Sequence, residues 1–136
     1  MMGHQNLSSM RLRIIVADDN PQMLQQLVSL LRTEFDVVAT AADGAAAREC
    51  IQRYKPDIAV LDIVMPKING IELTKQLSTN GYSTRIVICS IENDQETIEA
   101  ARSAGAVAYV FKPRMARDLI AAVKSAAAGS HFNSAE

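Results

Sequence analysis

Only two of the 136 residues are cysteine, and neither stands near a histidine or a second cysteine. Cys50 falls in a helix-like segment and Cys89 in an apolar, strand-like one, and no CxxC pair occurs. A zinc site needs grouped Cys and His ligands, and folds held by disulfides are typical of small secreted chains with many cysteines. We therefore expect two buried free thiols, and neither a disulfide nor a zinc site.

The chain also has almost no net charge and no long apolar run. Its formal net charge is −1, which gives no electrostatic basis for binding nucleic acid or an anionic membrane. Residues 1–10 lack the apolar core of a signal peptide, and no apolar run reaches the ~20 residues of a membrane span. Because 49% of the residues are hydrophobic, a disordered chain is excluded. We expect a cytoplasmic globular protein that itself binds neither nucleic acid nor membrane.

Strand-like and helix-like segments alternate regularly along the chain. Apolar runs rich in β-branched residues predict strands, and apolar residues at helical spacing predict helices. The predicted strands cover residues 12–17, 36–40, 57–61, 85–89 and 107–111. The predicted helices lie near residues 21–33, 43–54, 70–79, 94–104 and 116–128. The third and fourth strands are almost wholly apolar, which favours a parallel sheet with helices on both faces.

The length fits one domain with its own hydrophobic core. No internal repeat, low-complexity tract or linker interrupts residues 11–128. We therefore predict an N-terminal tail at residues 1–10, one α/β domain at residues 11–128, and a C-terminal tail or truncated linker at residues 129–136.

Reactive side chains follow four of the predicted strands at the point where each strand ends. Asp18 and Asp19 follow the first strand, Asp62 the third, Ser90 the fourth and Lys112 the fifth. In an open parallel α/β sheet, ligands bind just outside the carboxyl ends of the strands. An acid pair, a lone carboxylate, a hydroxyl and an ammonium at one such edge indicate a phosphoryl and metal site.

The three carboxylates carry most of the chemistry of this predicted site. Carboxylates within hydrogen-bonding reach repel one another and raise at least one pKa, unless a cation neutralises them. Mg²⁺ prefers a few carboxylate oxygens together with water and phosphate oxygens. With the metal present, one carboxylate can attack phosphorus and form an acyl phosphate. Asp62 is the candidate because it stands alone, while Ser90 and Lys112 suit the other phosphoryl oxygens.

Short motifs surround these residues in the same order along the chain. They are Ala17-Asp18-Asp19-Asn20, Leu61-Asp62-Ile63-Val64-Met65-Pro66 with Asn69-Gly70, Ser90, Gly105-Ala106, and Tyr109 through Lys112-Pro113. Together they resemble the receiver domain of two-component response regulators over about residues 11–128. The resemblance implies a doubly wound (βα)5 fold, CheY-like or flavodoxin-like, with a parallel sheet in the order 2-1-3-4-5. It also implies a phosphorylated signalling switch, not an enzyme.

The resemblance assigns the acceptor and the metal ligands. Asp62 is implied to be the phosphoacceptor. Asp18 and Asp19 are implied to hold Mg²⁺, or Mn²⁺ in its place, together with Asp62 and the backbone carbonyl of Val64. The implied phosphoryl donor is a sensor histidine kinase or a phosphotransfer protein.

The resemblance also assigns the groups that respond to phosphorylation. Ser90 and Lys112 are implied to sense the phosphoryl group, and Tyr109 to turn inward when Ser90 moves. The Lys112-Pro113 peptide bond is implied to be cis. Phosphorylation is expected to change the face formed by the fourth helix, the fifth strand and the fifth helix, with a homodimer as one outcome of activation.

Two positions depart from the commonest pattern of that family. Ile91 stands where a small residue is common, and its branched side chain is expected to narrow access to the site. Val64 offers no polar side chain that could orient an attacking water, whereas Glu92, two residues after Ser90, can do so. We therefore expect slow reaction with small donors and a long-lived aspartyl phosphate.

The end of the chain does not decide how the domain would pass on its signal. Gly129, Phe132 and Ser134 stand at offsets that resemble the junction between receiver and linker in LuxR-type DNA-binding regulators. No helix-turn-helix follows in this sequence. Two alternatives remain: a truncated piece of such a transcription regulator, or a single-domain receiver that acts by docking to partners.

Three other classes fit these residues less well. A flavodoxin-like FMN carrier needs a loop rich in Ser, Thr or Gly after the first strand, where Asp18 and Asp19 repel a phosphate. A haloacid-dehalogenase-like phosphatase expects its nucleophile there with a second acid two residues on, but here the two acids are adjacent. A receiver relic that accepts no phosphate is disfavoured because every acceptor and sensor position is filled.

Overall fold

Six parallel strands form one sheet in the order β2-β1-β3-β4-β5-β6 in the computed structural model, which describes residues 11–134. The strands are β1 (Arg13–Ala17), β2 (Asp36–Ala41), β3 (Ile58–Leu61), β4 (Arg85–Ser90), β5 (Ala108–Phe111) and β6 (Phe132–Asn133). The helices are α2 (Pro21–Leu31), α3 (Gly44–Tyr54), α4 (Gly70–Thr79), α5 (Gln95–Ala104) and α6 (Met115–Ala127), and a 3-10 turn, η1 (Lys112–Arg114), joins β5 to α6.

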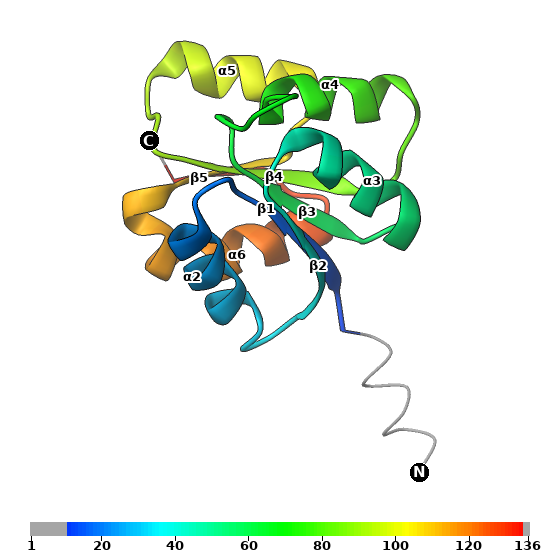
Figure 1. The fold of residues 1–136 in the computed structure, drawn as a ribbon. Helices are drawn as coiled ribbons and strands as arrows, with labels where there is room; N and C mark the ends of the chain where they lie inside the picture. The colour runs from blue at the N-terminus through cyan, green and yellow to red at the C-terminus, as the bar shows by residue number, and fades with distance from the viewer. Residues whose placement is uncertain (1–10, 135–136) are drawn as a thin grey trace.

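The helices cover both faces of the sheet (Figure 1). Helices α3, α4 and α5 lie on one face, and α2 and α6 lie on the other. Side chains of β1 alternate between the two cores: Ile15 packs towards α3 and α4, and Ile14 towards α2 and α6, as the two-residue period of a strand requires. The doubly wound class and the order of the first five strands are therefore confirmed, and β6 is an addition that the sequence analysis did not predict.

Polar side chains begin four of the helices at the edge of the sheet where the strands end. Asn20, Asp43, Asn69 and Asp94 each accept a hydrogen bond from a backbone N–H in the first turn of the helix that follows. Such caps satisfy donors that the helix itself leaves open. They fix the loops of this edge close to the strand ends.

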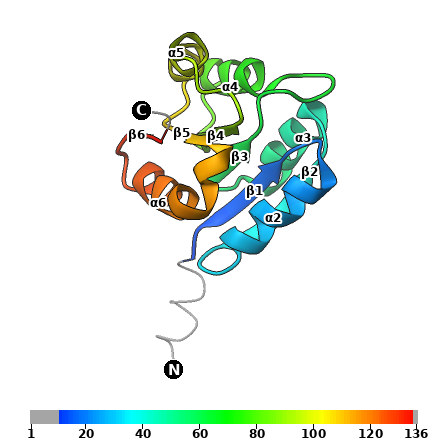
Figure 2. The same ribbon diagram turned by 90° about the vertical axis from the view of Figure 1, so that its left-hand side faces the viewer.

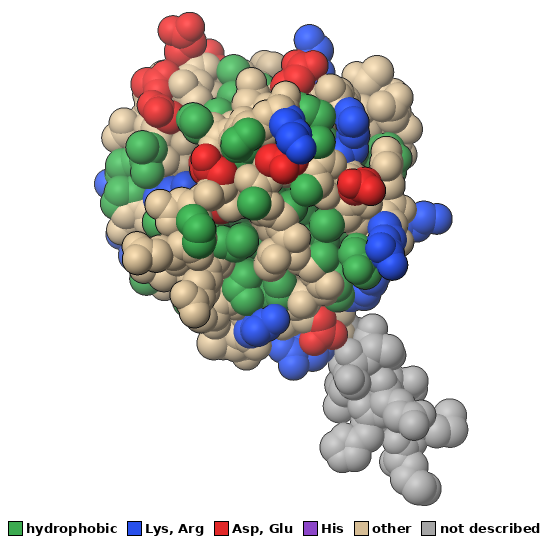
Figure 3. All heavy atoms as spheres, viewed as in Figure 1, with side chains coloured by type: hydrophobic (Ala, Val, Ile, Leu, Met, Phe, Trp, Pro, Cys, Tyr) green, Lys and Arg blue, Asp and Glu red, His purple; other side chains and the backbone are tan. Residues whose placement is uncertain are grey.

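Charged side chains are spread unevenly over the surface, although they nearly cancel in number. Figure 3 shows one group of acidic side chains at the upper left corner, over the beginning of α5, with further acidic side chains across the upper face and several Lys and Arg along the edges. The exposed acidic residues in and just before α5 are Glu92, Asp94, Glu96 and Glu99, and they define what is called the acidic corner below. Within residues 11–134, no helix is both long enough and apolar enough to cross a membrane.

Both cysteines are free thiols, as expected. Cys89 is buried in β4, and burial raises the pKa of its thiol to about 12. Cys50 is only partly buried, so the expectation of two buried thiols holds for one of them. The predicted N-terminal tail lies outside the described residues, as do residues 135–136.

Gly70, the first residue of α4, lies against the loop after β3, which begins with the candidate phosphoacceptor Asp62. A Cβ atom at this position would lie 2.0 Å from the carbonyl oxygen of Asp62 and 2.9 Å from its carbonyl carbon. The Gly70 N–H also donates a 2.8 Å hydrogen bond to the carbonyl of Ile63. Helix α4 can therefore begin this close to the loop after β3 only with a residue that has no side chain.

The Gly70→Ala variant is expected to lower the free energy of unfolding by about 1–3 kcal/mol, because the added methyl group overlaps a backbone atom that cannot move freely. Urea unfolding followed by circular dichroism measures the change. Gly81→Asn is the matched control, since position 81 has a φ of +75° with no atom within 4 Å of a Cβ, and Asn tolerates that conformation. Equal stability of Gly70→Ala and the parent would contradict the proposed close contact.

Candidate functional site

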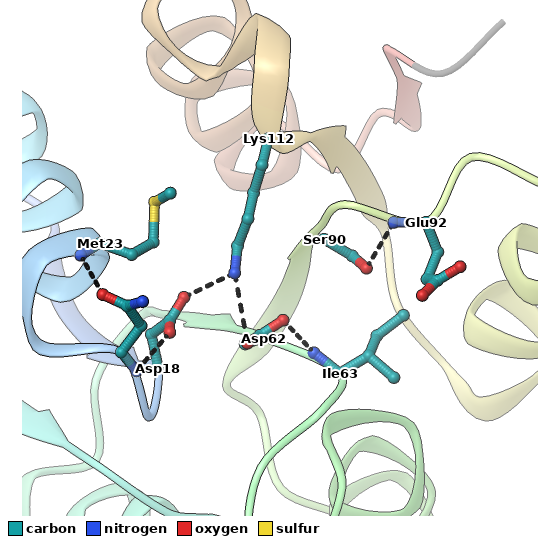
Figure 4. A network of polar contacts seen from close by, with 8 residues as sticks. Asp18, Met23, Asp62, Ile63, Ser90, Glu92 and Lys112 are labelled. Carbon is teal, nitrogen blue, oxygen red and sulfur yellow. Dashed lines mark hydrogen bonds and ion pairs between the residues drawn. The ribbon is translucent and has the colours of Figure 1, made fainter.

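The predicted reactive side chains meet in one open pocket at the carboxyl ends of β1, β3, β4 and β5, and Figure 4 shows Asp18, Asp62, Ser90 and Lys112 of this group. The pocket has a volume of about 310 Å³. It is lined by Asp18, Asp19, Asn20, Met23, Asp62, Val64, Ser90, Ile91 and Lys112. The sheet order thus brings together residues that lie up to almost a hundred positions apart in the sequence.

Three carboxylates form the acidic part of the pocket. Asp18, Asp19 and Asp62 each offer one oxygen, and these oxygens lie within 4.8 Å of one another. Asp18 is 1% exposed and Asp62 8% exposed, whereas Asp19 is open to solvent. Clustered carboxylate oxygens beside an open space are the donor set that Mg²⁺ prefers. The residues present therefore fit a hard divalent cation.

The ammonium of Lys112 lies between two of these carboxylates. Its Nζ is 2.7 Å from Asp18 Oδ2 and 3.2 Å from Asp62 Oδ2. Burial alone lowers the pKa of Lys112, but the hydrogen bond to Asp18 and the charges of Asp62 and Asp18 outweigh burial and raise the pKa above its ordinary value. Lys112 therefore stays charged at neutral pH and balances part of the acidic cluster.

The Asp62 carboxylate is largely shielded from solvent, and this burial changes its pKa. Burial raises the pKa of Asp62 above its ordinary value, the charge of Lys112 offsets part of that effect, and the charge of Asp18 adds to it. Its Oδ1 accepts a 2.8 Å hydrogen bond from the backbone N–H of Ile63. Each of its oxygens thus has one partner, which fixes the orientation of the carboxylate in the pocket.

Ser90 and Tyr109 are linked through the backbone of Glu92. Ser90 Oγ accepts a 3.0 Å hydrogen bond from the Glu92 N–H, and the Tyr109 hydroxyl donates a 2.8 Å hydrogen bond to the Glu92 carbonyl. Tyr109 is buried, and burial raises the pKa of its hydroxyl. Tyr109 is thus buried and bound to the loop after β4 in this structure, and its expected response to a movement of Ser90 stays a prediction.

The implied cis peptide bond between Lys112 and Pro113 is wrong, because residues 11–134 contain no cis peptide bond. Lys112 instead begins the 3-10 turn η1, with Pro113 in its first positions. A proline at the start of a helical turn has a suitable φ and loses no hydrogen bond, since its missing N–H is not needed there. A trans bond also has the lower intrinsic energy.

Two apolar side chains form part of the rim of the pocket. Val64 is 65% exposed and Ile91 67% exposed, and both line the pocket. Ile91 therefore lies at the pocket entrance, as the expected narrowing of that entrance requires. Its effect on the access of small phosphoryl donors stays a prediction. The Glu92 side chain is exposed, and its expected role towards water also stays a prediction.

Two backbone amides that the sequence analysis did not assign to the site orient its carboxylates. The Asn20 N–H donates a 2.9 Å hydrogen bond to Asp18 Oδ1, and the Ile63 N–H acts in the same way on Asp62. Residue type says nothing about an amide donor, so these contacts leave little trace in the sequence. The one usable signal was Asp18 itself, because an Asp side chain commonly accepts a hydrogen bond from the backbone N–H two residues on.

Comparison with known proteins gives a consistent result. The family described as the response regulator receiver domain matches residues 14–124. The transcriptional regulatory protein DegU of Brevibacillus brevis is 31% identical over 131 residues, which cover 95% of this chain and 56% of that protein. The nitrate/nitrite response regulator protein NarL of Escherichia coli K12 is 34% identical over 119 residues, 85% of this chain and 55% of that protein. The chain thus spans about half the length of these relatives.

A solved structure shows the same fold. The signal receiver domain of the putative response regulator NarL from Mycobacterium tuberculosis superposes with a TM-score of 0.84 and 30% sequence identity. The match covers 88% of this chain and 98% of that one. The similarity therefore extends over the whole arrangement of strands and helices that builds the pocket.

The Asp62→Asn variant is expected to be more stable than the parent at pH 7 in metal-free buffer. Burial raises the pKa of Asp62 above its ordinary 3.8, so ionisation of this carboxyl destabilises the folded state. Stability from such a group is complete below the unfolded-state pKa and is lost as pH rises through the folded-state pKa.

The advantage of Asp62→Asn should therefore vanish in acid and grow as the pH rises to neutrality. Urea midpoints measured across this range test it, with Glu99→Gln, an exposed carboxylate on α5, as the control that shows no such trend. A variant less stable than the parent at pH 7 would contradict the assigned electrostatics.

Proposed function

Because this chain belongs to the response regulator receiver domain family, we propose that it is a phosphorylated switch in which Asp62 is the phosphoacceptor. The observation that carries this proposal is the position of Asp62: its Oδ2 lies 3.2 Å from the ammonium of Lys112, in an open pocket that two further carboxylates share. This arrangement supports a carboxylate nucleophile with a phosphoryl-binding cation and a set of metal ligands beside it.

We propose that Asp18, Asp19 and Asp62 hold Mg²⁺, or Mn²⁺, and that the backbone carbonyl of Val64 is a further ligand. When bound, the cation supplies positive charge that reduces the repulsion among the carboxylates and the incoming phosphoryl oxygens. Asp18 and Asp62 are already oriented by backbone amides, so two of the three acids are preorganised for this role.

In the proposed reaction, a carboxylate oxygen of Asp62 forms a bond to phosphorus as the bond from phosphorus to the donor nitrogen breaks. The donor is the phosphohistidine of a sensor kinase or of a phosphotransfer protein, and its imidazole leaves with the electron pair of the broken bond. Lys112 then donates from its ammonium to a phosphoryl oxygen, and the Ser90 hydroxyl, which can donate as well as accept, binds another.

The response to phosphorylation is proposed to run from Ser90 to the face formed by α5, β5 and α6. When Ser90 turns towards the phosphoryl group, the Glu92 N–H loses its 3.0 Å acceptor. The same residue holds the Tyr109 hydroxyl through its carbonyl. A shift of the Ser90 loop therefore changes the environment of Tyr109 and the acidic corner at the start of α5, and it can alter affinity for a partner or a second copy.

We propose a cytoplasmic signalling role with two alternative outputs. The relatives named above are transcriptional or nitrate-responsive regulators, which favours control of transcription through a DNA-binding domain outside this sequence. A single-domain receiver that docks to partner proteins is the second candidate, because the α5–β5–α6 face contains the elements expected to change on phosphorylation.

The proposal predicts that acetyl phosphate with Mg²⁺ adds one phosphoryl group to the parent, detected by intact-protein mass spectrometry, and that chelation of the metal or the Asp62→Asn change abolishes the addition. Asp57→Asn is the matched control, because Asp57 is exposed at the opposite end of β3. Undiminished phosphorylation of Asp62→Asn would rule out the assignment. Flavin absorbance or steady phosphatase turnover would favour the FMN carrier or the phosphatase.

The Ile91→Ala variant is expected to react several-fold faster with acetyl phosphate, because the change removes an exposed branched side chain from the rim of the pocket. The rate is followed by quenched samples in mass spectrometry. Ile91→Leu serves as the control, since it keeps the volume of the side chain, and it should stay close to the parent. If Ile91→Ala is no faster than Ile91→Leu, then side-chain bulk at this position does not limit access.

A further inference from the structure

The C-terminal segment, residues 130–134, lies along the outer edge of β5. Within it, β6 pairs in parallel with β5, with Phe132 opposite Ala108 and Asn133 opposite Tyr109. Figure 2 shows β6 beside β5 at the end of the sheet, next to α6. Phe132 packs against the hydrophobic core that α2 and α6 cover. The segment predicted as a tail is thus a docked part of the domain.

Ser134 ends this segment and is 5% exposed. Its N–H donates a 3.0 Å hydrogen bond to the Tyr109 carbonyl. Its hydroxyl accepts a 2.7 Å hydrogen bond from the Phe111 N–H, and its carbonyl accepts one from the Arg114 guanidinium. Phe111 directly precedes Lys112, and Arg114 follows two residues after it. One buried serine therefore binds the chain on both sides of the lysine of the site.

The contacts of Ser134 affect the position of Lys112, because this residue is fixed both at its ammonium and at its backbone. At its ammonium, Nζ lies 2.7 Å from Asp18 and 3.2 Å from Asp62, and the side chain is 9% exposed. At its backbone, Lys112 begins the short turn η1 directly after β5. A side chain that long reaches a fixed point only if the backbone from which it extends is itself fixed.

We propose that Ser134 is a positioning residue for the candidate phosphorylation site, acting through the backbone on both sides of Lys112. This inference rests on the proposed roles of Asp62 and Lys112. An ammonium that is already held beside the acceptor loses little freedom when a phosphoryl group arrives, and such preorganised charge binds a developing anion more strongly. The docked segment therefore raises the affinity of the site for a phosphoryl group.

The coupling must also operate in the opposite direction. If docking of residues 130–134 favours an occupied site, then occupation of the site favours docking by the same factor. The segment thus responds to the site through β5 and η1, a route distinct from the loop that carries Ser90. Any part of the protein attached to this segment receives the signal without contact with the α5 side of the domain.

The test uses beryllofluoride with Mg²⁺ as a phosphoryl mimic, bound to the parent, Ser134→Ala and Ser130→Ala. Ser134→Ala is expected to weaken the binding of the mimic about five- to tenfold, the lower part of the usual range for coupled sites. Ser130→Ala removes an exposed hydroxyl from the same segment and should bind as the parent does. In the parent, the mimic should slow hydrogen exchange at the amides of Phe111 and Ser134.

A purely structural role of Ser134 would lower the urea midpoint and leave the affinity for the mimic unchanged, and that result would overturn the inference. Tighter binding by Ser134→Ala would overturn it as well.

Carbon-13 relaxation at Lys112 Cε separates this inference from the proposed function, because it needs no ligand. The Lys112 side chain should be more mobile in Ser134→Ala than in Ser130→Ala, and equal mobility would contradict the positioning role. If the parent does not bind beryllofluoride, the proposed function is wrong, and the relaxation data still decide whether Ser134 positions the lysine.

Discussion

The ion pairs of Lys112 with Asp18 and Asp62 are the interaction on which the rest of the site depends. Two nearly buried carboxylates within a few ångströms of each other destabilise a fold unless a positive charge lies beside them. The sheet order supplies that charge, because β5 lies beside β4 and its lysine reaches back across the sheet edge to β3 and β1. The same side chain therefore holds the carboxylates in place and lies where it can bind an anion that enters the pocket.

The charge balance also suggests how phosphorylation of Asp62 could affect surfaces far from the pocket. In the proposed switch, a phosphoryl group on Asp62 would give Lys112 and Ser90 a new anionic partner, and each would then exchange a partner that it has in this structure. Both residues stand at the ends of adjacent strands. The Ser90 loop leads to Tyr109 through the backbone of Glu92, and the Lys112 turn leads to Ser134. These contacts offer the proposed switch two routes out of the site, one towards α5 and one towards the C-terminal segment.

The fold class and the position of the charged pocket could be predicted from the sequence because both depend on local patterns. Asp18, Asp62, Ser90 and Lys112 each follow an apolar run directly, and parallel strands bring such ends to one edge of the sheet. In contrast, β6 is two residues long, too short for any periodicity to be seen. Its pairing depends on the open edge of β5, which the linear sequence does not reveal.

Other features escaped prediction for a different physical reason. The amide donors that orient Asp18 and Asp62 belong to the backbone of Asn20 and Ile63, so the types of the donor residues do not reveal them. The peptide bond before Pro113 was assigned by resemblance alone, and its trans form reflects the local turn. A crystal structure with Mg²⁺ and beryllofluoride tests the central claim most directly. We expect beryllium on a carboxylate oxygen of Asp62, with Lys112 shifted from that carboxylate to a fluorine. Beryllium bound elsewhere, or an unchanged pair between Lys112 and Asp62, would contradict the proposed switch.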